Sequence, residues 1–586
     1  MIANQEVAKI FDQMAAALEI LGANVFRINS YARGARVVEE LTEDVRALVE
    51  ENPATAIKRL ATIEGIGKGL AEKIAEYVEV GSVHEHQELL QKVPATLFEL
   101  LEIPGIGPKA AKTLWQELGI ASIDDLKNTP DEKLASLPRM GKKTVENIRK
   151  AIAFSEKGGE RVPLGQALPI ALLLRDELRK VAGVERLEYA GSLRRGKETI
   201  GDLDFLAATT DPAALREAFV SRPEVRQVLA KGDTKCSVRL EAAGVAMQAD
   251  LRLVPLAVFG AALMYFTGSK EHNVRLRELA IRKNQRLNEY GLFAGTDERP
   301  QDRGEAPLAA ATEEAIYQAL GLPYIEPERR EDRGELEAGS LRLIELADIR
   351  AELHAHTTAS DGRLTIRELA LEAKRRGFHT IAVTDHSKGQ PIAGGLSPER
   401  LLEHIRAVRA VDAENLGIKI LAGSEVDILP DGSLDYEDEL LAQLDIVVAS
   451  PHNALRQEPE LATERLLKAI RHPLVHIIGH PTGRIINRRQ GLEPDMGALI
   501  AAAVSSDTAL ELNSNWHRLD LRDTHLRAAL EAGCKIAIDT DAHDVPHFDF
   551  LTYGITTARR AAMLPESCIN TWPAEKLHAW LRSKRK

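Results

Sequence analysis

The sequence lacks most of the features that mark secreted or membrane-bound proteins. Its three cysteines, Cys236, Cys534 and Cys568, lie far apart, which excludes a disulfide framework and a cysteine zinc site. Aromatic residues make up only 4% of the chain, and no apolar run approaches the length of a membrane span. We therefore expect a cytoplasmic protein without a membrane partner.

An excess of positive charge is also missing. The formal net charge is −12, whereas nucleic-acid-binding proteins usually present a basic face, because phosphate contacts dominate their affinity. An acidic total still allows local basic patches and carboxylates that hold metal ions. Net charge alone therefore leaves nucleic-acid binding open.

The chain of 586 residues is too long for one hydrophobic core and is expected to form several domains. Its first residues have apolar side chains at helical spacing, which indicates an amphipathic helix rather than a signal peptide. Only His84, His86 and His272 of the 17 histidines precede residue 350. We interpret the charge-rich segment 326–347 as a connector between two functional halves.

A short repeat occurs in the N-terminal region: IEGIGKGLAEKI at 63–74, IPGIGPKAAKTL at 103–114 and a weaker LPRMGKKTVENI at 137–148. Each copy has a hydrophobic residue, a glycine-containing hairpin and a basic amphipathic helix. Glycines permit close backbone approach and leave amide N–H groups at the helix start available for a phosphate oxygen. A tight helix–helix turn without a ligand is the alternative for any single copy. The repeat, which looks like the helix-hairpin-helix motif, predicts contacts with DNA backbones without sequence preference, through Gly65, Gly67, Gly105 and Gly107.

Two strand-like segments in the middle of the chain carry carboxylates. In GDLDFL at 201–206, Asp202 and Asp204 fall on one face of a strand and the apolar residues on the other. Such neighbouring carboxylates repel each other unless a cation lies between them. A second strand, MQADLRLV at 247–254, presents Asp250. Three carboxylates on adjacent strands suit Mg²⁺, and two ions there could activate a hydroxyl and stabilise a leaving pyrophosphate; a solvated polar face on an edge strand is the alternative.

Four segments resemble the family X DNA polymerases of the DNA polymerase beta type: GSLRRGKETIGDLDFL at 191–206, ADLRLV with Asp250, YFTGSKEHNVRLR at 265–277 and NEYGLF at 288–293. The similarity runs from the N-terminal helices to about residue 335. It implies a DNA-end-binding domain, fingers, palm and thumb, with Asp202, Asp204 and Asp250 holding two Mg²⁺ ions. The nucleotide-binding residues that it implies are Ser192 and Arg195 for the triphosphate, Tyr265, Phe266 and Gly268 for the sugar, Asn273 for the base and Arg277 for the template. Gln248 and Lys270 depart from the pattern of other members without removing a metal ligand.

The same resemblance implies a deoxyribose-phosphate lyase site. Lys73, in LAEKIAEY, matches the Schiff-base lysine, and Arg27 and Tyr31 match supporting positions. Gly69 and Glu85, however, stand where relatives have lysines. A surface lysine on a helix is therefore the alternative for Lys73.

Beyond the connector, several apolar runs of strand length end in a residue that can bind a metal. They are TIAVTDH, IKILAGSE, DIVVASPH, LVHIIGH and KIAIDTDAH. Helical stretches lie between them. Strands that alternate with helices and carry functional side chains at their carboxyl ends predict a parallel α/β barrel with its catalytic face. One such histidine could be a hydrogen-bonded core residue, but the repeated position argues for a metal centre.

These ligands resemble the metal-binding pattern of the polymerase-and-histidinol-phosphatase (PHP) domain over about residues 348–575. The matching residues are His354, His356, Asp361, His386, Glu425, His452, His480, Asp541 and His543. The resemblance implies a distorted (β/α)₇ barrel with up to three metal ions and phosphoesterase chemistry. Imidazole and carboxylate ligands without thiolates suit Mn²⁺, Zn²⁺ or Fe. Arg484, in GHPTGR, is a candidate for a further phosphate contact.

The expected fold class is multidomain α/β, with a helical helix-hairpin-helix N-terminal region, a nucleotidyltransferase-type mixed-sheet palm with a thumb, and the C-terminal barrel. The expected boundaries are 1–85 for a DNA-end-binding domain, 86–158 for helix-hairpin-helix fingers, 159–260 for the palm, 261–335 for the thumb, 336–347 for a linker and 348–586 for the PHP domain.

Together the halves resemble bacterial family X polymerases with a C-terminal PHP domain. This implies a DNA repair enzyme that fills short gaps in primer-template DNA from deoxynucleoside triphosphates. The barrel would act as a 3′→5′ exonuclease, with abasic-site cleavage and 3′-phosphate removal as other chemistries. Two alternatives remain: an enzyme that keeps only the C-terminal chemistry, as a nuclease or a small-molecule phosphatase, and a scaffold with idle sites. We expect a monomer, since nothing indicates an obligate interface.

Overall fold

The computed structural model describes residues 2–40, 45–63, 65–101, 103, 106–138, 140–141, 144–145, 148–149, 161–295 and 300–584. The chain divides into two compact units, Met1–Glu160 with Asp495–Gly497, and Arg161–Pro494 with Ala498–Lys586. Among the described residues, no helix is both long enough and apolar enough to cross a membrane.

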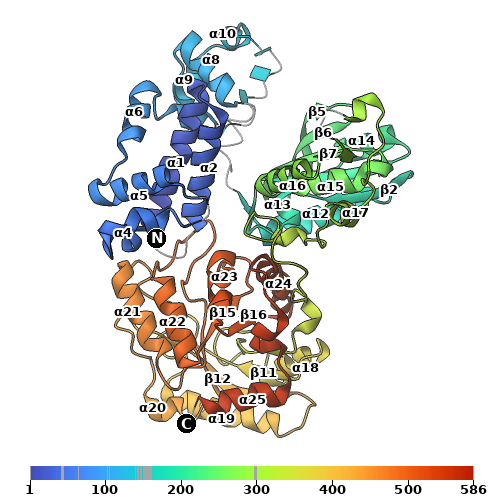
Figure 1. Ribbon diagram of the computed structural model, residues 1–586. Helices are drawn as coiled ribbons and strands as arrows, with labels where there is room; N and C mark the ends of the chain where they lie inside the picture. The colour runs from blue at the N-terminus through green and yellow to red at the C-terminus, as the bar shows by residue number, and fades with distance from the viewer. Residues whose placement is uncertain are drawn as a thin grey trace. The chain divides into compact units, whose positions relative to one another are not determined.

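The first unit is helical (Figure 1). Its helices are α1 (Ile2–Leu21), α2 (Val25–Glu40), α3 (Val45–Glu50), α4 (Pro53–Leu60), α5 (Lys68–Val80), α6 (His84–Lys92), α7 (Leu97–Leu101), α8 (Pro108–Leu118), α9 (Ile123–Asn128) and α10 (Asp131–Ala135). Helix α1 packs along α2, and the rings of Phe11 and Tyr31 meet edge to face at 5.8 Å. Val7, Phe11 and Met14 are fully buried in this core, as their helical spacing predicts.

The palm is built on a five-stranded mixed sheet. Its strands, in sheet order, are β2 (Val184–Tyr189), β4 (Asp202–Thr209), β7 (Val245–Leu253), β6 (Lys235–Ala242) and β5 (Val225–Lys231). Strands β4 and β7 pair in parallel, and the other neighbours pair antiparallel. Helices α12 (Leu164–Leu178) and α14 (Pro212–Val220) bury the face that carries Leu203 and Phe205. The opposite face carries the aspartates of β4, because side chains alternate along a strand.

The remaining elements of this region lie beside the sheet. They are β1 (Val162–Pro163), paired with β3 (Thr199–Ile200), and α13 (Gly191–Arg194), followed by the thumb with η1 (Leu256–Val258), α15 (Phe259–Thr267), α16 (Lys270–Arg282), β8 (Gln285–Asn288), β9 (Gly291–Ala294), η2 (Pro300–Arg303), α17 (Glu313–Ala319) and η3 (Pro327–Arg329). Phe259 and Leu263 of α15 pack on Leu206 and Ala208, further along the aspartate face of β4. The thumb therefore covers the far end of that face and leaves the end with the aspartates accessible.

The C-terminal half is a seven-stranded, all-parallel barrel with its strands in chain order. They are β10 (Ala351–Glu352), β11 (Thr380–Val383), β12 (Lys419–Asp427), β13 (Ile446–Ser450), β14 (Ile477–Ile478), β15 (Ala509–Asn513) and β16 (Ile536–Asp539). A parallel bridge between Ala355 and Ala542 joins the chain after β10 to the chain after β16, and this nearly closes the barrel. The predicted fold class is confirmed.

Helices follow the strands around the barrel (Figure 1). They are α18 (Ile366–Arg375), α19 (Pro398–Asp412), α20 (Asp438–Leu441), α21 (Pro459–Ile470), α22 (Met496–Ser506), α23 (Asp523–Glu531), α24 (Leu551–Arg560) and α25 (Ala574–Ser583), with single 3₁₀ turns at η4 (Leu346–Asp348), η5 (Val545–Phe550), η6 (Pro565–Ser567) and η7 (Ile569–Thr571). Leu577, Trp580 and Leu581 of α25 pack on residues that begin the barrel strands, including Ala351 and Ile446. Helix α25 thus closes the amino end of the barrel and leaves the carboxyl end for function.

The palm and the barrel pack directly on each other within the second unit. A Cβ placed on Gly165 of α12 would lie 2.0 Å from Cγ of Trp516, so only glycine fits there. Arg559 of α24 donates to Glu328 at 2.7 Å. Part of the connector packs on the barrel, since Leu343 and Ile344 are buried and the Ile344 N–H donates to the Met563 carbonyl at 3.0 Å.

Candidate active sites

The strand register brings two of the predicted aspartates together in the palm. Asp204 on β4 lies directly opposite Asp250 on β7, and Asp202 lies opposite Gln248. Burial, followed by the charges of Asp202 and Asp250, raises the pKa of Asp204 to about 7. Burial and Asp250 also raise the pKa of Asp202. The repulsion between these carboxylates raises the free energy of the charged site, and a divalent cation that binds among them lowers it.

A lysine that the sequence did not single out contacts this group. Nζ of Lys235 on β6 lies 2.5 Å from Oδ2 of Asp250, and the Gln248 amide donates to Oδ1 of the same carboxylate at 3.1 Å. The lysine therefore supplies positive charge on the carboxylate face. In the sequence, only the position of Lys235 at the start of a strand marks it. That position does not reveal which strand lies beside it in the sheet.

The turn before β4 shapes the aspartate site. Gly191 has a φ of +61°, and a Cβ there would lie 2.4 Å from Oδ2 of Asp204. Ser192 follows on the half-buried turn of α13. The Arg195 guanidinium donates to the Thr267 carbonyl at 2.5 Å and to Glu331 at 3.0 Å. The predicted triphosphate residues therefore lie between the aspartates and the start of the thumb.

The predicted sugar and base contacts lie together on α15 and α16. Tyr265 and Phe266 meet edge to face at 5.2 Å, and Tyr265 is 37% exposed. The Asn273 amide donates to the Tyr265 carbonyl at 2.7 Å, and Arg277 donates to the Asn273 carbonyl at 3.2 Å. A Cβ on Gly268, whose φ is +73°, would lie 3.1 Å from Nη1 of Arg195. The structure therefore joins the sugar and triphosphate residues into one surface.

The first hairpin has the geometry expected for contact with a phosphate backbone. Gly67 is the N-cap of α5, and no described side chain caps this helix. Gly65, with φ +95°, approaches α2 so closely that a Cβ would lie 2.7 Å from Val37. Both glycines and Arg33 line a surface concavity. Gly107 caps α8 in the same way, whereas Gly105 lies outside the described residues.

Lys73 does not stand alone on its helix. Its Nζ lies 2.9 Å from Oε2 of Glu85, and the Tyr31 hydroxyl donates to Oε1 of the same carboxylate at 2.9 Å. Arg27 also donates to Glu85. Although burial raises the pKa of Glu85, hydrogen bonds from Lys73, Arg27 and Tyr31 lower it overall. Glu85, which stands where relatives have a lysine, thus holds Lys73 in an ion pair.

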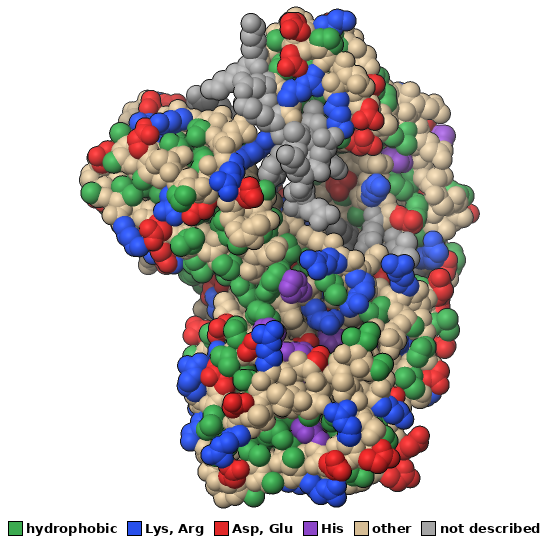
Figure 2. Space-filling view, turned by 180° about the vertical axis from the view of Figure 1, so that it is seen from behind, with side chains coloured by type: hydrophobic (Ala, Val, Ile, Leu, Met, Phe, Trp, Pro, Cys, Tyr) green, Lys and Arg blue, Asp and Glu red, His purple; other side chains and the backbone are tan. Residues whose placement is uncertain are grey.

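In the barrel, the predicted ligands converge where the strands end. Three groups have donor atoms within 4.8 Å of one another: His356, Asp361, His386 and His543; His354, His356 and Asp541; and His386, Glu425 and His452. In the described parts of the chain, the palm aspartates do not form a group this tight. Figure 2 shows histidine side chains gathered on one face of the barrel, with Lys and Arg side chains around them. The structure therefore brings eight of the nine predicted residues into these groups, and the ninth, His480, lies outside them but contacts Glu425.

Glu425 lies among the histidines. Its carboxylate oxygens are 2.8 Å from Nδ1 of His386, 2.9 Å from Nε2 of His480 and 3.2 Å from Nε2 of His452. Burial raises the pKa of this carboxyl, but the charges of the surrounding histidines hold it well below its usual range. A charged carboxylate among these histidines would be one of the residues that hold metal ions.

Several buried polar atoms of this centre have no hydrogen-bond partner in the structure. They include Nδ1 of His356 and Nδ1 of His480. Oε2 of Glu425 and Oδ1 of Asp541 lie 2.8 Å from Nδ1 of His386 and 3.1 Å from Nε2 of His356, but without hydrogen-bond geometry. Burial and the neighbouring His543 and His386 lower the pKa of His356 to about 4, so its ring is neutral at pH 7. Neutral imidazole is the form that binds metals. Buried polar atoms without a hydrogen-bond partner are rare in proteins unless a water or an ion binds them. The residues present therefore fit metal ions.

Carboxylates that the sequence reading missed support these ligands. Glu511 on β15 accepts from Nδ1 of His354 at 2.7 Å and from the His480 N–H at 2.6 Å. Asp427 pairs with Nδ1 of His452. Such partners fix a histidine so that its other nitrogen faces the metal. TALELN at 508–513 follows the same pattern of an apolar run ending in polar residues and could have revealed Glu511.

The expectation that Arg484 contacts a phosphate is wrong. Its side chain is buried and donates to Glu198 of the palm at 2.6 Å and to the Leu519 carbonyl at 2.6 Å. The local GHPTGR pattern did not reveal this, because Glu198 lies 286 residues earlier in the chain. Arg484 therefore joins the palm to the barrel.

A carboxylate-bearing mixed sheet with a thumb, joined to a parallel barrel with a buried His and carboxylate centre, defines a nucleotidyltransferase fused to a metal-dependent phosphoesterase. Family models agree with this class. They match a helix-hairpin-helix domain at 2–83, a SAM-like helix-hairpin-helix tandem at 97–153, the DNA polymerase beta thumb at 262–331 and the PHP domain at 352–515.

Similar proteins cover both halves. The protein named DNA polymerase/3′-5′ exonuclease PolX of Bacillus subtilis (strain 168) is 38% identical over 581 residues, which is 99% of each chain. DNA polymerase lambda of Rattus norvegicus is 27% identical over 56% of each chain. A probable phosphatase of Syntrophotalea carbinolica is 31% identical over 37% of this chain and 90% of its own. The chain belongs to the family X DNA polymerases that carry a C-terminal PHP domain.

Proposed function

We propose that this protein fills short gaps in DNA with its palm and trims primer 3′ ends in the 3′→5′ direction with its barrel. The observation that carries the proposal is the presence of two separate sets of metal-type ligands in one chain. Asp204 and Asp250 pair across strands of the palm, and the histidines and carboxylates converge at the barrel strand ends. The polymerase/exonuclease name of the full-length relative supports the same division.

In the palm, Asp202, Asp204 and Asp250 would hold two Mg²⁺ ions, which would supply activation of the primer 3′-hydroxyl and stabilisation of the leaving pyrophosphate. Asp250, whose carboxylate contacts Lys235 and Gln248, would help to accept the proton of that hydroxyl. Ser192 and Arg195 bind the triphosphate. Tyr265, Phe266 and Gly268 crowd the 2′ position of the sugar and so favour deoxynucleotides, while Asn273 and Arg277 contact base and template.

The helical unit holds the DNA. The amides at the starts of α5 and α8, after Gly67 and Gly107, have no side-chain cap and suit phosphate oxygens. Such contacts ignore base identity, which fits an enzyme that acts at gaps of any sequence. The lyase role of Lys73 stays a prediction that its ion pair with Glu85 does not support.

In the barrel, up to three metal ions would be held by nine residues, and Mn²⁺ or Zn²⁺ fits their mixed donors: His354, His356, Asp361, His386, Glu425, His452, His480, Asp541 and His543. Such ions would supply a nucleophile from water and charge stabilisation at the phosphate. Glu511 and Asp427 keep the histidine rings oriented. His480 and Asp541 have positive φ values of 26° and 53°, a strained backbone that is common at functional sites.

A labelled primer on a single-nucleotide gap tests the proposal. The wild type, Asp204→Ala and His356→Ala are compared with and without deoxynucleotides, in Mg²⁺ and in Mn²⁺. We expect Asp204→Ala to lose extension and still shorten the primer, and His356→Ala to do the reverse. If His356→Ala shortens the primer as fast as the wild type, the barrel is not the exonuclease.

A phosphomonoesterase role for the barrel is the second candidate. The similarity to a probable phosphatase over 90% of that protein favours it. A primer that ends in a 3′-phosphate separates the two roles, because a phosphomonoesterase releases inorganic phosphate without shortening the primer. Cleavage of an abasic site is measured on the same gel.

Three finer points rest on the sequence alone. The domain boundaries at residues 85, 158, 260, 335 and 347 are proposals within the two units. We expect a monomer, and a measurement of the molecular mass in solution tests this. The cytoplasmic location likewise stays a prediction.

A further inference from the structure

Arg195, the residue to which we assign the triphosphate, is held by a carboxylate as well as by the palm. Its Nε donates to Oε1 of Glu331 at 3.0 Å, and Nη1 donates to the Thr267 carbonyl. Glu331 thus takes the place that a phosphate oxygen would take beside this guanidinium. The inference that follows rests on this proposed role of Arg195.

A residue of the barrel shares that carboxylate. Nη1 of Arg560, at the end of α24, donates to Oε1 of Glu331 at 2.9 Å and to the main-chain carbonyl of Arg195 at 2.7 Å. The side chains of Arg560 and Glu331 are only 3% and 9% exposed. Burial raises the pKa of Glu331, but Arg560 and Arg195 hold it far below its usual range. Glu331 is therefore a buried carboxylate with two guanidinium partners.

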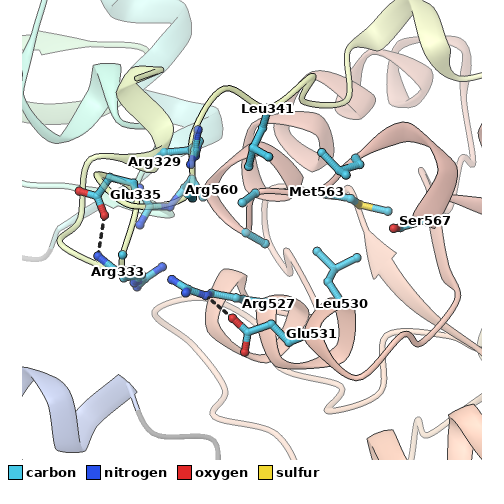
Figure 3. A pocket seen from close by; sticks show the side chains of 15 residues that line it. Arg329, Arg333, Glu335, Leu341, Arg527, Leu530, Glu531, Arg560, Met563 and Ser567 are labelled. Carbon is cyan, nitrogen blue, oxygen red and sulfur yellow. Dashed lines mark hydrogen bonds and ion pairs between the residues drawn. The ribbon is translucent and has the colours of Figure 1, made fainter. Parts of the chain in front are cut away.

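Arg560 is itself fixed from the other side. Its Nε and Nη2 lie 3.0 and 2.8 Å from Oδ2 of Asp523 on α23, and Asp523 also pairs with Arg333 at 3.1 Å. Figure 3 shows Arg560 and Arg333 close together, with Arg329 nearby, beside a cavity of about 280 Å³. Water in this cavity can reach position 560, so a shorter side chain there leaves no dry void.

The backbone after Arg195 also touches α24. Gly196 has a φ of +64°, and a Cβ there would lie 2.1 Å from Cγ2 of Thr556. The turn that carries Arg195 is therefore pressed against the same helix that carries Arg560. The barrel therefore contacts the main chain of Arg195 directly and its side chain through Glu331.

We propose that Arg560 is a positioning residue for nucleotide binding in the palm: it holds Glu331 and the Arg195 carbonyl, so that Arg195 can exchange Glu331 for the incoming triphosphate. When Arg195 turns to a phosphate, Arg560 remains as the counterion of the buried Glu331. Without Arg560, Glu331 keeps Lys197 at 4.0 Å and depends on Arg195 for its close partner. Leaving a buried carboxylate unpaired is costly, so Arg195 is then released less readily.

Steady-state gap filling by the full chain tests this proposal. We expect Arg560→Met to raise the KM for the deoxynucleotide about tenfold, as expected for one charged hydrogen bond, and to change kcat much less. Arg559→Met is the matched control, because Arg559 is on the same helix and crosses the same interface to Glu328 without touching Arg195 or Glu331. Its KM should equal that of the wild type. An equal rise in both variants, or a fall in kcat alone, overturns the proposal.

Two further variants guard against a general loss of structure. Arg560→Lys keeps the charge but cannot hydrogen-bond Asp523, Glu331 and the Arg195 carbonyl together. We therefore expect its KM to lie between those of the wild type and Arg560→Met. A KM equal to that of the wild type would contradict the positioning role of Arg560. In a Glu331→Gln background the Arg560→Met change should lose most of its effect, because the competing carboxylate is gone and only the bond to the Arg195 carbonyl is still lost. The exonuclease rate reports that the barrel stays folded.

Arg195→Lys separates this proposal from the function on which it rests. If its KM for the deoxynucleotide is unchanged, the triphosphate assignment itself is wrong. If its KM rises while Arg560→Met matches Arg559→Met, only the role of Arg560 fails.

Discussion

Gly191 lies against the carboxylate of Asp204, with room for no further atom: a Cβ at Gly191 would be 2.4 Å from Oδ2 of the aspartate. The glycine also has a left-handed φ of +61°. The position of a metal-type ligand is therefore set by a residue without a side chain, in the turn that precedes the triphosphate residues.

Gly191→Ala should lower gap filling by about a hundredfold, because the new methyl group displaces Asp204 from its place opposite Asp250. Exonuclease activity should be unchanged. Gly244→Ala is the control, since Gly244 also has a positive φ, +76°, but open space around it. Equal losses in both variants would trace the effect to backbone strain instead. The measurement is single-turnover extension of a gapped primer.

Glu511→Gln should weaken metal binding by the barrel by about 10- to 100-fold, because His354 loses its charged partner. The readout is the Mn²⁺ concentration that gives half-maximal primer shortening. Asp445→Asn is the control, because Asp445 accepts from the Ala422 N–H near the start of β13, away from the metal ligands. Extension should be equal in both variants. Unchanged Mn²⁺ dependence in Glu511→Gln would remove Glu511 from the centre.

Glu313→Gln should destabilise the protein by roughly 3 kcal/mol at pH 7, because Arg194 and Arg330 lose their buried partner. Burial raises the pKa of Glu313, but Arg330 and Arg194 lower it overall, from 4.5 to about 2. A lowered pKa stabilises the fold fully above the unfolded value of 4.5, and this stabilisation is lost as the pH falls toward 2.

The difference in urea unfolding midpoint between wild type and Glu313→Gln should therefore shrink between pH 5 and pH 3. Glu314→Gln, an exposed neighbour, should show no such difference. A gap between wild type and Glu313→Gln that is constant with pH would mean that the ionisation of Glu313 is not its source.

The wild type should form little borohydride-trapped complex with abasic-site DNA, because Lys73 is held by Glu85 at 2.9 Å. Glu85→Gln should raise the trapped fraction several-fold, since the ion pair is removed. Glu88→Gln, which alters a more exposed pair with His84, is the control. Strong trapping by the wild type that disappears in Lys73→Ala would restore the lyase prediction.

The sequence predicted those parts of the sites in which ligands repeat at one structural position. The barrel strands could be recognised because their apolar runs end in residues that can bind a metal. His386, Glu425 and His452 lie together in the structure, as that pattern predicts. The alternation in GDLDFL likewise places Asp202 and Asp204 on one face. In both cases, local spacing along the chain determines the geometry.

What the sequence did not predict depends on contacts between distant segments. Lys235 reaches Asp250 only because β6 adjoins β7. Arg484 has the local surroundings of a site residue and yet pairs with Glu198. The sequence marked the charge-rich connector only by its composition, which did not reveal that some of its charges pair with buried partners, as Arg330 does with Glu313. Charge content alone does not reveal whether a segment is exposed.

The contact between Gly165 and Trp516 bears on any chimera made from this protein. A polymerase half from this chain, joined to the barrel of a relative, presents a bare glycine to whatever side chain stands at the position of Trp516. A residue smaller than Trp516 leaves a cavity beside Gly165, and any larger residue at position 165 clashes with the Trp516 indole. Recombination between family members should therefore preserve these two positions as a pair, and the natural unit of exchange is the palm together with its barrel.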